Sequence, residues 1–128
     1  MTHRNSSLSE PARQAARALF AEIDGARTVV IATADGFDLA HAGHPAIDPA
    51  RLAAMISSFA ALGEAASREI GIGSPRCLVI ESTEGRLVVR CVRAQGQALV
   101  VVVLIDKSVM LGQVLNRLAA AEQLMNVP

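Results

Sequence analysis

The spacing of hydrophobic positions along the chain predicts three helices and five strands. Apolar residues recur every three to four positions in three segments, which is typical of amphipathic helices. These predicted helices cover about residues 10–24, about 49–70, and a last segment that a cap at 106 or 108 begins and that ends near 125. Short apolar or β-branched runs predict strands over residues 28–33, 37–42, 76–82, 86–93 and 98–105. The predicted order is therefore α-β-β-α-β-β-β-α.

Local signals place the ends of these elements. Ser9 followed by Pro11 is typical of a helix start, so residues 1–8 are expected to form a flexible tail before a single domain over residues 9–128. The pair Asp35-Gly36 predicts a tight hairpin between the first two strands. Asp48 and Pro49 begin the middle helix in the same way, and two glycines end it.

One strand is expected at the centre of the sheet. Residues 98–105 are apolar at both odd and even positions, so neither face of this strand suits water. An antiparallel sheet covered on both faces by helices is a three-layer α/β/α sandwich, here with five strands. We expect the first and last helices on one face, the middle helix on the other, and residues 76–82 at an open edge.

The middle helix carries no charge from Leu52 to Gly63. A bulky apolar stripe is expected to face the sheet; it consists of Leu52, Met55, Ile56, Phe59, Leu62, Ala66 and Ile70. The other side carries small residues where a charged face would be usual. A helix that is apolar all round is covered on both sides, and a second copy of the chain is favoured here over the chain's own loop at residues 70–75 or its N-terminal tail. The predicted dimer interface comprises Ala53, Ala54, Ser57, Ala60, Ala61 and Glu64, with Cys77, Val79 and Glu81 of the edge strand.

The order of elements and several segments resemble the Roadblock/dynein light chain family, whose bacterial members include the regulator of a gliding-motility Ras-like GTPase. The matching segments are VVIATADGFDLA (29–40), LAAMISSFAALGEA (52–65), IGIG (70–73), LVIE (78–81), GRLVV (85–89) and ALVVVVL (98–104). The resemblance implies a Roadblock/profilin-like fold and a homodimer with one continuous sheet. It also implies a non-enzymatic regulator or scaffold that binds partners, notably a small Ras-like GTPase.

The composition narrows the range of partners. There are 12 basic and 12 acidic residues and only three aromatic side chains, all Phe, so the chain lacks the features of a nucleic-acid binder. The longest apolar run, residues 98–105, is too short to cross a bilayer, and the start of the chain does not resemble a signal peptide. We therefore expect a cytoplasmic protein without membrane insertion. The scarcity of lysine beside many arginines suggests a GC-rich bacterial genome.

Candidate chemistry is sparse. His41 and His44 could bind a metal, but their spacing lacks a clear third ligand, and a pair of loop histidines is favoured. Cys77 and Cys91 are equidistant from the turn at residues 83–85, so they could face each other; two buried thiols are favoured over a redox pair. No catalytic arrangement and no phosphate-binding P-loop is recognisable, so we predict no catalytic, metal or cofactor residues.

Four arginines on the third and fourth predicted strands could dock an acidic partner, or could simply block unwanted strand pairing at the sheet edge. They are Arg76, Arg86, Arg90 and Arg93. Two further functions remain open beside GTPase regulation: a sensory module for a small ligand, and a structural subunit of a larger signalling or motility assembly.

Overall fold

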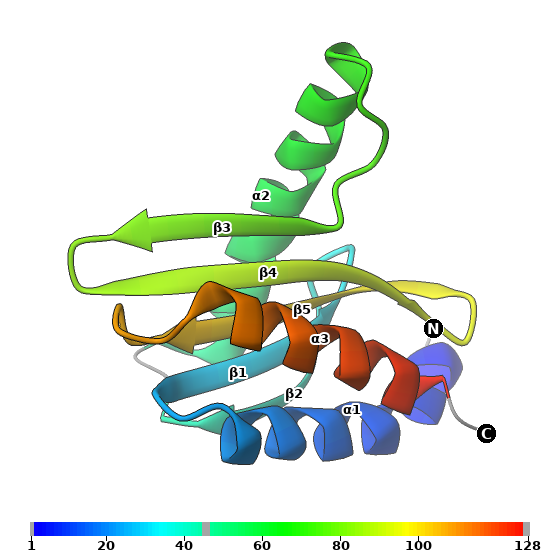
Figure 1. Ribbon diagram of the computed structural model, residues 1–128. Helices are drawn as coiled ribbons and strands as arrows, with labels where there is room; N and C mark the ends of the chain where they lie inside the picture. Colours follow the sequence, from blue (N-terminus) through cyan, green and yellow to red (C-terminus); the bar gives the residue numbers. More distant parts are fainter. Residues whose placement is uncertain (1, 45–46, 127–128) are drawn as a thin grey trace.

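The computed structural model describes residues 2–44 and 47–126 and contains the predicted order of elements (Figure 1). The helices are α1 (Thr2–Glu22), α2 (Pro49–Glu69) and α3 (Leu111–Met125). The strands are β1 (Ala26–Thr33), β2 (Asp38–Gly43), β3 (Cys77–Ser82), β4 (Gly85–Ala94) and β5 (Gln97–Ile105). The predicted α-β-β-α-β-β-β-α order is confirmed.

The five strands form one antiparallel sheet in the order β2-β1-β5-β4-β3. The predicted central strand is confirmed, because Val101 of β5 pairs with Ile31 on one side and with Arg90 on the other. Strand β3 pairs only with β4 within the described residues, so its outer edge is open as predicted.

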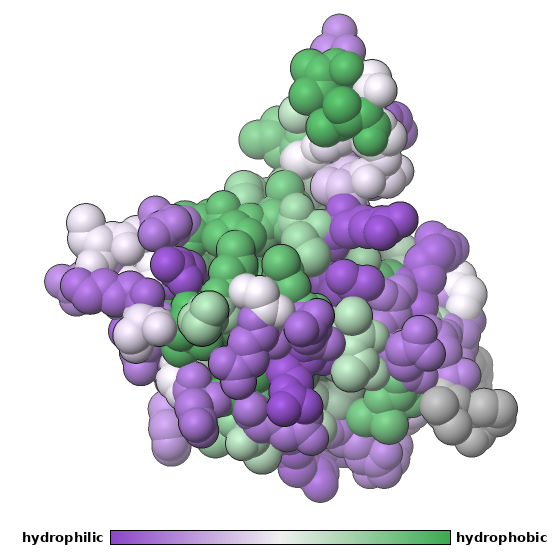
Figure 2. All heavy atoms as spheres, in the orientation of Figure 1, coloured by the Kyte–Doolittle hydropathy of each residue, from purple (hydrophilic) through white to green (hydrophobic). Residues whose placement is uncertain are grey.

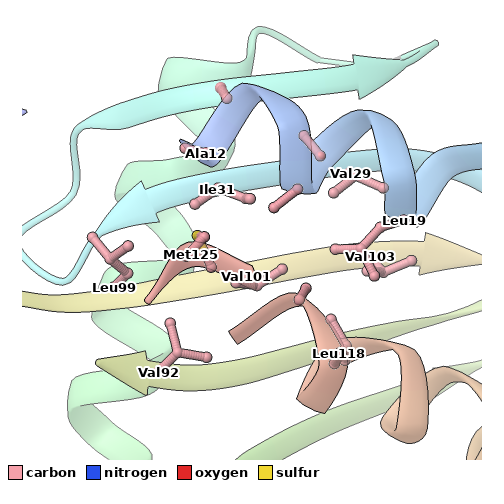
Figure 3. Packing of buried hydrophobic residues seen from close by; sticks show 14 of the residues in the cluster. Ala12, Leu19, Val29, Ile31, Val92, Leu99, Val101, Val103, Leu118 and Met125 are labelled. Atoms are coloured by element: carbon pink, nitrogen blue, oxygen red, sulfur yellow. The ribbon is translucent and has the colours of Figure 1, made fainter. Parts of the chain in front are cut away.

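Helices cover the sheet in the predicted three layers. On one face α1 and α3 pack side by side; Leu19, Leu118 and Met125 meet strand residues such as Val29 and Val101 (Figure 3). On the other face α2 lies alone, and Ala53 and Ile56 contact strand residues that include Val30, Val89 and Val102. The side chains of β5 alternate between these two cores, which explains why the strand is apolar at both parities.

The first helix begins earlier than predicted. It starts at Thr2, so the expected flexible tail is helical in the part that is described. Pro11 lies inside the helix and removes one backbone hydrogen bond, but Leu8, Ala12 and Ala15 continue the buried stripe at helical spacing. Burial of Leu8, which is only 1% exposed, outweighs the local signal for a helix start at Ser9.

Capping residues predicted the start of α2 correctly but not the start of α3. The Asp48 side chain accepts a hydrogen bond of 3.2 Å from the backbone N–H of Ala50, which confirms the predicted start of α2. Helix α3 begins at Leu111, later than predicted. Met110 occupies its cap position, and no side chain caps the helix there.

Candidate interaction surfaces

Helix α2 faces the sheet differently from the prediction. Ala53 and Ile56 are buried against the sheet, at 0% and 4% exposure. Met55 and Leu62, which were predicted to face the sheet, are 54% and 71% exposed. The helix is therefore rotated about its axis so that part of the small-residue side faces inward and much of the bulky stripe faces outward.

Small residues allow α2 to approach its own sheet closely. A Cβ atom added at Gly36 in the β1–β2 turn would lie 3.1 Å from Ser57 Oγ and 3.6 Å from Ala54 Cα. At Gly63 an added Cβ would lie 2.7 Å from Leu78 Cδ2. The small side chains, predicted to admit a second molecule, thus serve partly for packing inside one chain.

The residues predicted for the dimer interface consequently fall into three groups. Ala53 lies on the sheet-facing side of α2 and is fully buried within the chain, so its assignment to the interface was wrong. Ser57, Ala60 and Glu64 are half-buried on the side of the helix that borders a groove. The exposed members are Ala54, Ala61, Val79 and Glu81, whereas Cys77 is half-buried.

An exposed apolar surface lies on the outward side of α2 and beyond it. We call it the apolar face; it comprises Met55, Leu62, Ile70, Ile72 and Ile80, which are between 40% and 71% exposed. Helix α2 extends past the edge strand β3, so the end of the helix stands clear of its own sheet (Figure 1). Figure 2, in which α3 faces the viewer, shows one group of hydrophobic residues at the protruding end of α2. A second group over β3 and β4 lies on the sheet face that carries α3 and is separate from the apolar face. Exposed apolar surface of this kind is a common feature of protein–protein interaction sites.

A groove runs along the opposite side of α2. It has a volume of about 510 Å³ and is bounded by α2, by the loop that leads into β3, and by the ends of β4 and β5. Its lining includes Ser57, Ala60, Ala61, Glu64 and Arg68 of α2, Ser74 and Pro75 of the loop, and Cys91, Arg93, Ala98 and Val100 of the strands. Glu122 of α3 reaches its end. We call this the α2 groove; no sequence pattern indicated it.

The four predicted docking arginines divide into two pairs. Arg86 donates a 2.7 Å hydrogen bond to the Val109 carbonyl and lies 3.5 Å from a carboxylate oxygen of Glu81. Arg90 binds Glu122 at 3.0 Å; burial alone would lower its pKa, but the hydrogen bonds with Glu122 and Cys77 raise it. These two side chains are occupied within the chain, whereas Arg76 and Arg93 are exposed.

The two cysteines do not face each other. Cys77 pairs with Arg90, one position short of Cys91, so the two thiols lie on opposite faces of the sheet. Both are free, and both are half-buried rather than fully buried. Burial raises the pKa of the Cys91 thiol, and the nearby Cys77 and Glu64 add to this effect.

Two other residues considered in the sequence, His44 and Ser57, make contacts within the chain. The His44 ring meets the Phe20 ring edge-on, with centroids 6.3 Å apart. The Ser57 hydroxyl donates to the Ala54 carbonyl at 2.9 Å, within its own helix. Among residues 2–44 and 47–126 there is no group of three or more His, Cys, Asp or Glu side chains that could hold a metal ion. None of the described helices has the length and hydrophobicity needed to cross a bilayer.

Solved structures of known proteins share this fold. MglB from Myxococcus xanthus is 21% identical, with a TM-score of 0.75 over 94% of this chain and 92% of that one. The gliding protein MglB from Thermus thermophilus is 22% identical, with a TM-score of 0.76 over 93% and 88% of the two chains. A profilin from Acanthamoeba castellanii, at 12% identity, has a TM-score of 0.61 over 88% and 94%.

Sequence comparisons give the family itself. No curated protein sequence matches the chain significantly. The sequence profile of the Roadblock/LC7 domain, however, matches residues 14–104, which run from α1 to the end of the central strand β5. The predicted Roadblock/profilin-like architecture is confirmed by the Roadblock and profilin structures. The chain belongs to the Roadblock/LC7 domain family.

Proposed function

We propose that the chain is a non-enzymatic homodimer that regulates or scaffolds a small Ras-like GTPase in the cytoplasm. The observation that carries the dimer is the apolar face together with the open edge of β3. An exposed strand edge and an exposed apolar helix side, both at the same border of the sheet, favour a partner that covers them together.

A second copy fits both features. If two β3 strands pair antiparallel about a two-fold axis, the sheet continues from one copy into the next. The end of α2 that extends past β3 then lies over the partner's sheet, and the apolar faces of the two copies come together. A helix and an edge strand readily supply the roughly 1,000 Å² that a stable interface needs.

The dimer is tested by placing a charge in the apolar face. Leu62→Glu should shift the sedimentation-equilibrium mass from dimer to monomer, because an unpaired carboxylate is costly to bury at an interface. The matched control is Ala21→Glu on α1, an exposed alanine on the other face of the sheet, which should remain dimeric. Dimerisation that survives Leu62→Glu unchanged would contradict the apolar face as the interface.

The GTPase partner is supported by family membership and by the MglB likeness. The Roadblock/LC7 profile match supports a regulatory or scaffold role. The resemblance to bacterial regulators of Ras-like GTPases makes such a GTPase the preferred partner. The chain contains no P-loop sequence, so nucleotide binding would belong to that partner.

Affinity purification from the native cell, with GDP or a GTP analogue present, tests the partner. We expect a P-loop protein of small-GTPase size whose recovery depends on the nucleotide. The purified pair should then show a changed rate of GTP hydrolysis or nucleotide exchange compared with the GTPase alone. Binding that is indifferent to nucleotide would favour a structural subunit, and repeated recovery without any P-loop protein would contradict GTPase regulation.

A further inference from the structure

The α2 groove lies on the side of α2 away from the apolar face. Ser57 lies two residues from Met55, and Ala60 lies two residues from Leu62, so each pair is separated by about 200° around the helix axis. A second copy that covers the apolar face therefore leaves this groove open. The groove thus requires an explanation separate from the dimer.

Two arginines without ion-pair partners among the described residues line the groove, and a third adjoins it. Arg68 comes from α2, and Arg93 comes from β4. Arg76 is outside the lining but adjoins it, because its carbonyl accepts a 2.9 Å hydrogen bond from the backbone N–H of Cys91, which lines the groove. Within residues 2–44 and 47–126, the Arg93 side chain donates one hydrogen bond, to the Gly96 carbonyl at 3.1 Å.

The two lining carboxylates neutralise these arginines only in part. Glu122 is bound to Arg90 at 3.0 Å. Glu64 accepts a 3.2 Å hydrogen bond from the Ser74 hydroxyl. With Glu122 already paired to Arg90, Glu64 is the lining carboxylate that has no ion pair among the described residues. The lining Arg68 and Arg93 and the adjoining Arg76 outnumber it, and this excess positive charge favours an acidic occupant.

The dimensions suit an extended segment of chain. From Ser57 to Arg68 the lining of α2 covers eleven residue steps, about 16 Å at 1.5 Å per residue. An extended peptide of about five residues has the same length. The lining also includes Ala60, Ala61 and Ala98, whose small side chains leave room for small apolar side chains of a ligand.

The backbone edge of β4 beside the groove is already occupied. The N–H of Cys91 donates to Arg76, and the N–H of Arg93 donates to the Glu122 carboxylate at 3.2 Å. The Arg93 carbonyl accepts from the Asn126 side chain at 2.8 Å. A bound segment would therefore be recognised through its side chains and not by adding a strand at this edge.

We propose that the α2 groove binds an extended acidic segment of a partner protein, in which carboxylates alternate with small apolar residues. The arginines at the groove bind the carboxylates through charge-assisted hydrogen bonds, and Ala60, Ala61 and Ala98 pack against the small side chains. The proposal rests on the proposed function only in assigning this segment to the regulated partner. Its test needs a peptide and no GTPase.

The probe is the capped pentapeptide Glu-Ala-Glu-Ala-Glu, compared with the same peptide in which glutamine replaces glutamate. In a Cys77→Ser background the remaining thiol is Cys91, which lines the groove. The acidic peptide at millimolar concentration should slow alkylation of Cys91 by iodoacetamide, and the glutamine peptide should not. Backbone NMR shifts of Ala60, Ala61 and Arg93 give a second measurement that does not depend on thiol reactivity.

Substitutions test whether the acidic peptide binds in the α2 groove. Arg68→Gln combined with Arg93→Gln should weaken the acidic peptide about tenfold, equivalent to losing about 1.4 kcal/mol. Arg17→Gln, an exposed arginine of α1, should leave binding unchanged. The Leu62→Glu variant should bind as wild type does, because the apolar face is separate from the groove.

Two results would overturn the proposal. One is the absence of both protection and NMR shifts at millimolar acidic peptide; the other is equal binding of the glutamine peptide. Neither result bears on the GTPase, whose recovery is measured without the peptide. Conversely, peptide binding without a GTPase partner would refute the proposed function and leave the groove's specificity standing.

Discussion

Glu122 of α3 binds Arg90 of β4 with one carboxylate oxygen, at 3.0 Å from Nη2 and 3.2 Å from Nε. Its other oxygen accepts a 3.2 Å hydrogen bond from the backbone N–H of Arg93. This single side chain therefore joins the last turns of α3 to β4, at Arg90, which pairs with the first residue of β3, and at Arg93, which lies beyond β3. Asn126 extends the connection by accepting a 2.8 Å hydrogen bond from the Gln95 N–H.

Removing this carboxylate should destabilise the fold. Glu122→Ala leaves a half-buried guanidinium and a strand N–H without their acceptor, and we expect a loss of about 1.5 to 3 kcal/mol in the free energy of unfolding. Urea denaturation measures the change. Gln123→Ala, an exposed neighbour on the same helix, is the control and should be nearly neutral. Equal stability of the two variants would mean that Glu122 is not a structural tie.

The rotation of α2 predicts opposite effects for two adjacent alanines. Ala53 is fully buried against the sheet and Ala54 is exposed. Ala53→Leu should cost about 1 to 3 kcal/mol through overpacking, whereas Ala54→Leu should change stability by less than about 0.5 kcal/mol. Both are best measured in the Leu62→Glu background, so that dimerisation does not contribute. A larger loss of stability for Ala54→Leu than for Ala53→Leu would instead support the helix orientation predicted from the sequence.

The orientation of α2 could not be read from the sequence for a physical reason. The order of elements and the central position of β5 were predictable because their apolar patterns are strong and end at clear turns. Helix α2 lacks charge from Leu52 to Gly63, so no polar side specifies which face meets water. Larger side chains suggested the inward face, yet close approach of α2 to Gly36 favoured small residues there.

The relative position of the two thiols was also predicted incorrectly, because the length of the turn between β3 and β4 was not clear from the sequence. The sequence suggested a turn at residues 83–85, which would have placed Cys77 opposite Cys91. In the structure Ser82 pairs with Gly85, so the turn holds two residues. A register change of one residue moves a side chain to the other face of the sheet. The α2 groove could not be predicted from the sequence either, because its lining comes from segments that are far apart in the chain.

Two glycines with positive φ should respond differently to alanine. At Gly96, with φ of 79°, nothing lies within 4 Å of an added Cβ, so Gly96→Ala should cost only the backbone strain of about 1 to 2 kcal/mol. At Gly43, with φ of 92°, the added Cβ would meet the Arg27 carbonyl and lie 2.8 Å from Phe20 Cε1. Gly43→Ala should therefore lose about 1 to 3 kcal/mol more. Thermal unfolding of both variants measures the difference, and equal losses would contradict close packing at Gly43.

Alkaline pH should weaken the contribution of Cys91 to stability. Burial raises the pKa of this thiol in the folded state above the unfolded value, which is about 8.5. As pH rises through the unfolded pKa, the unfolded chain releases the proton first, so the free energy of unfolding falls until pH exceeds the folded pKa. Cys91→Ser removes this ionisation, and the stability difference between wild type and Cys91→Ser should decrease from pH 7 to pH 9.5 in urea denaturation. Cys77→Ser, which keeps Cys91, should follow the wild-type trend. A wild type and a Cys91→Ser variant that lose stability in parallel would show that the thiol is as well solvated in the folded protein as in the unfolded chain.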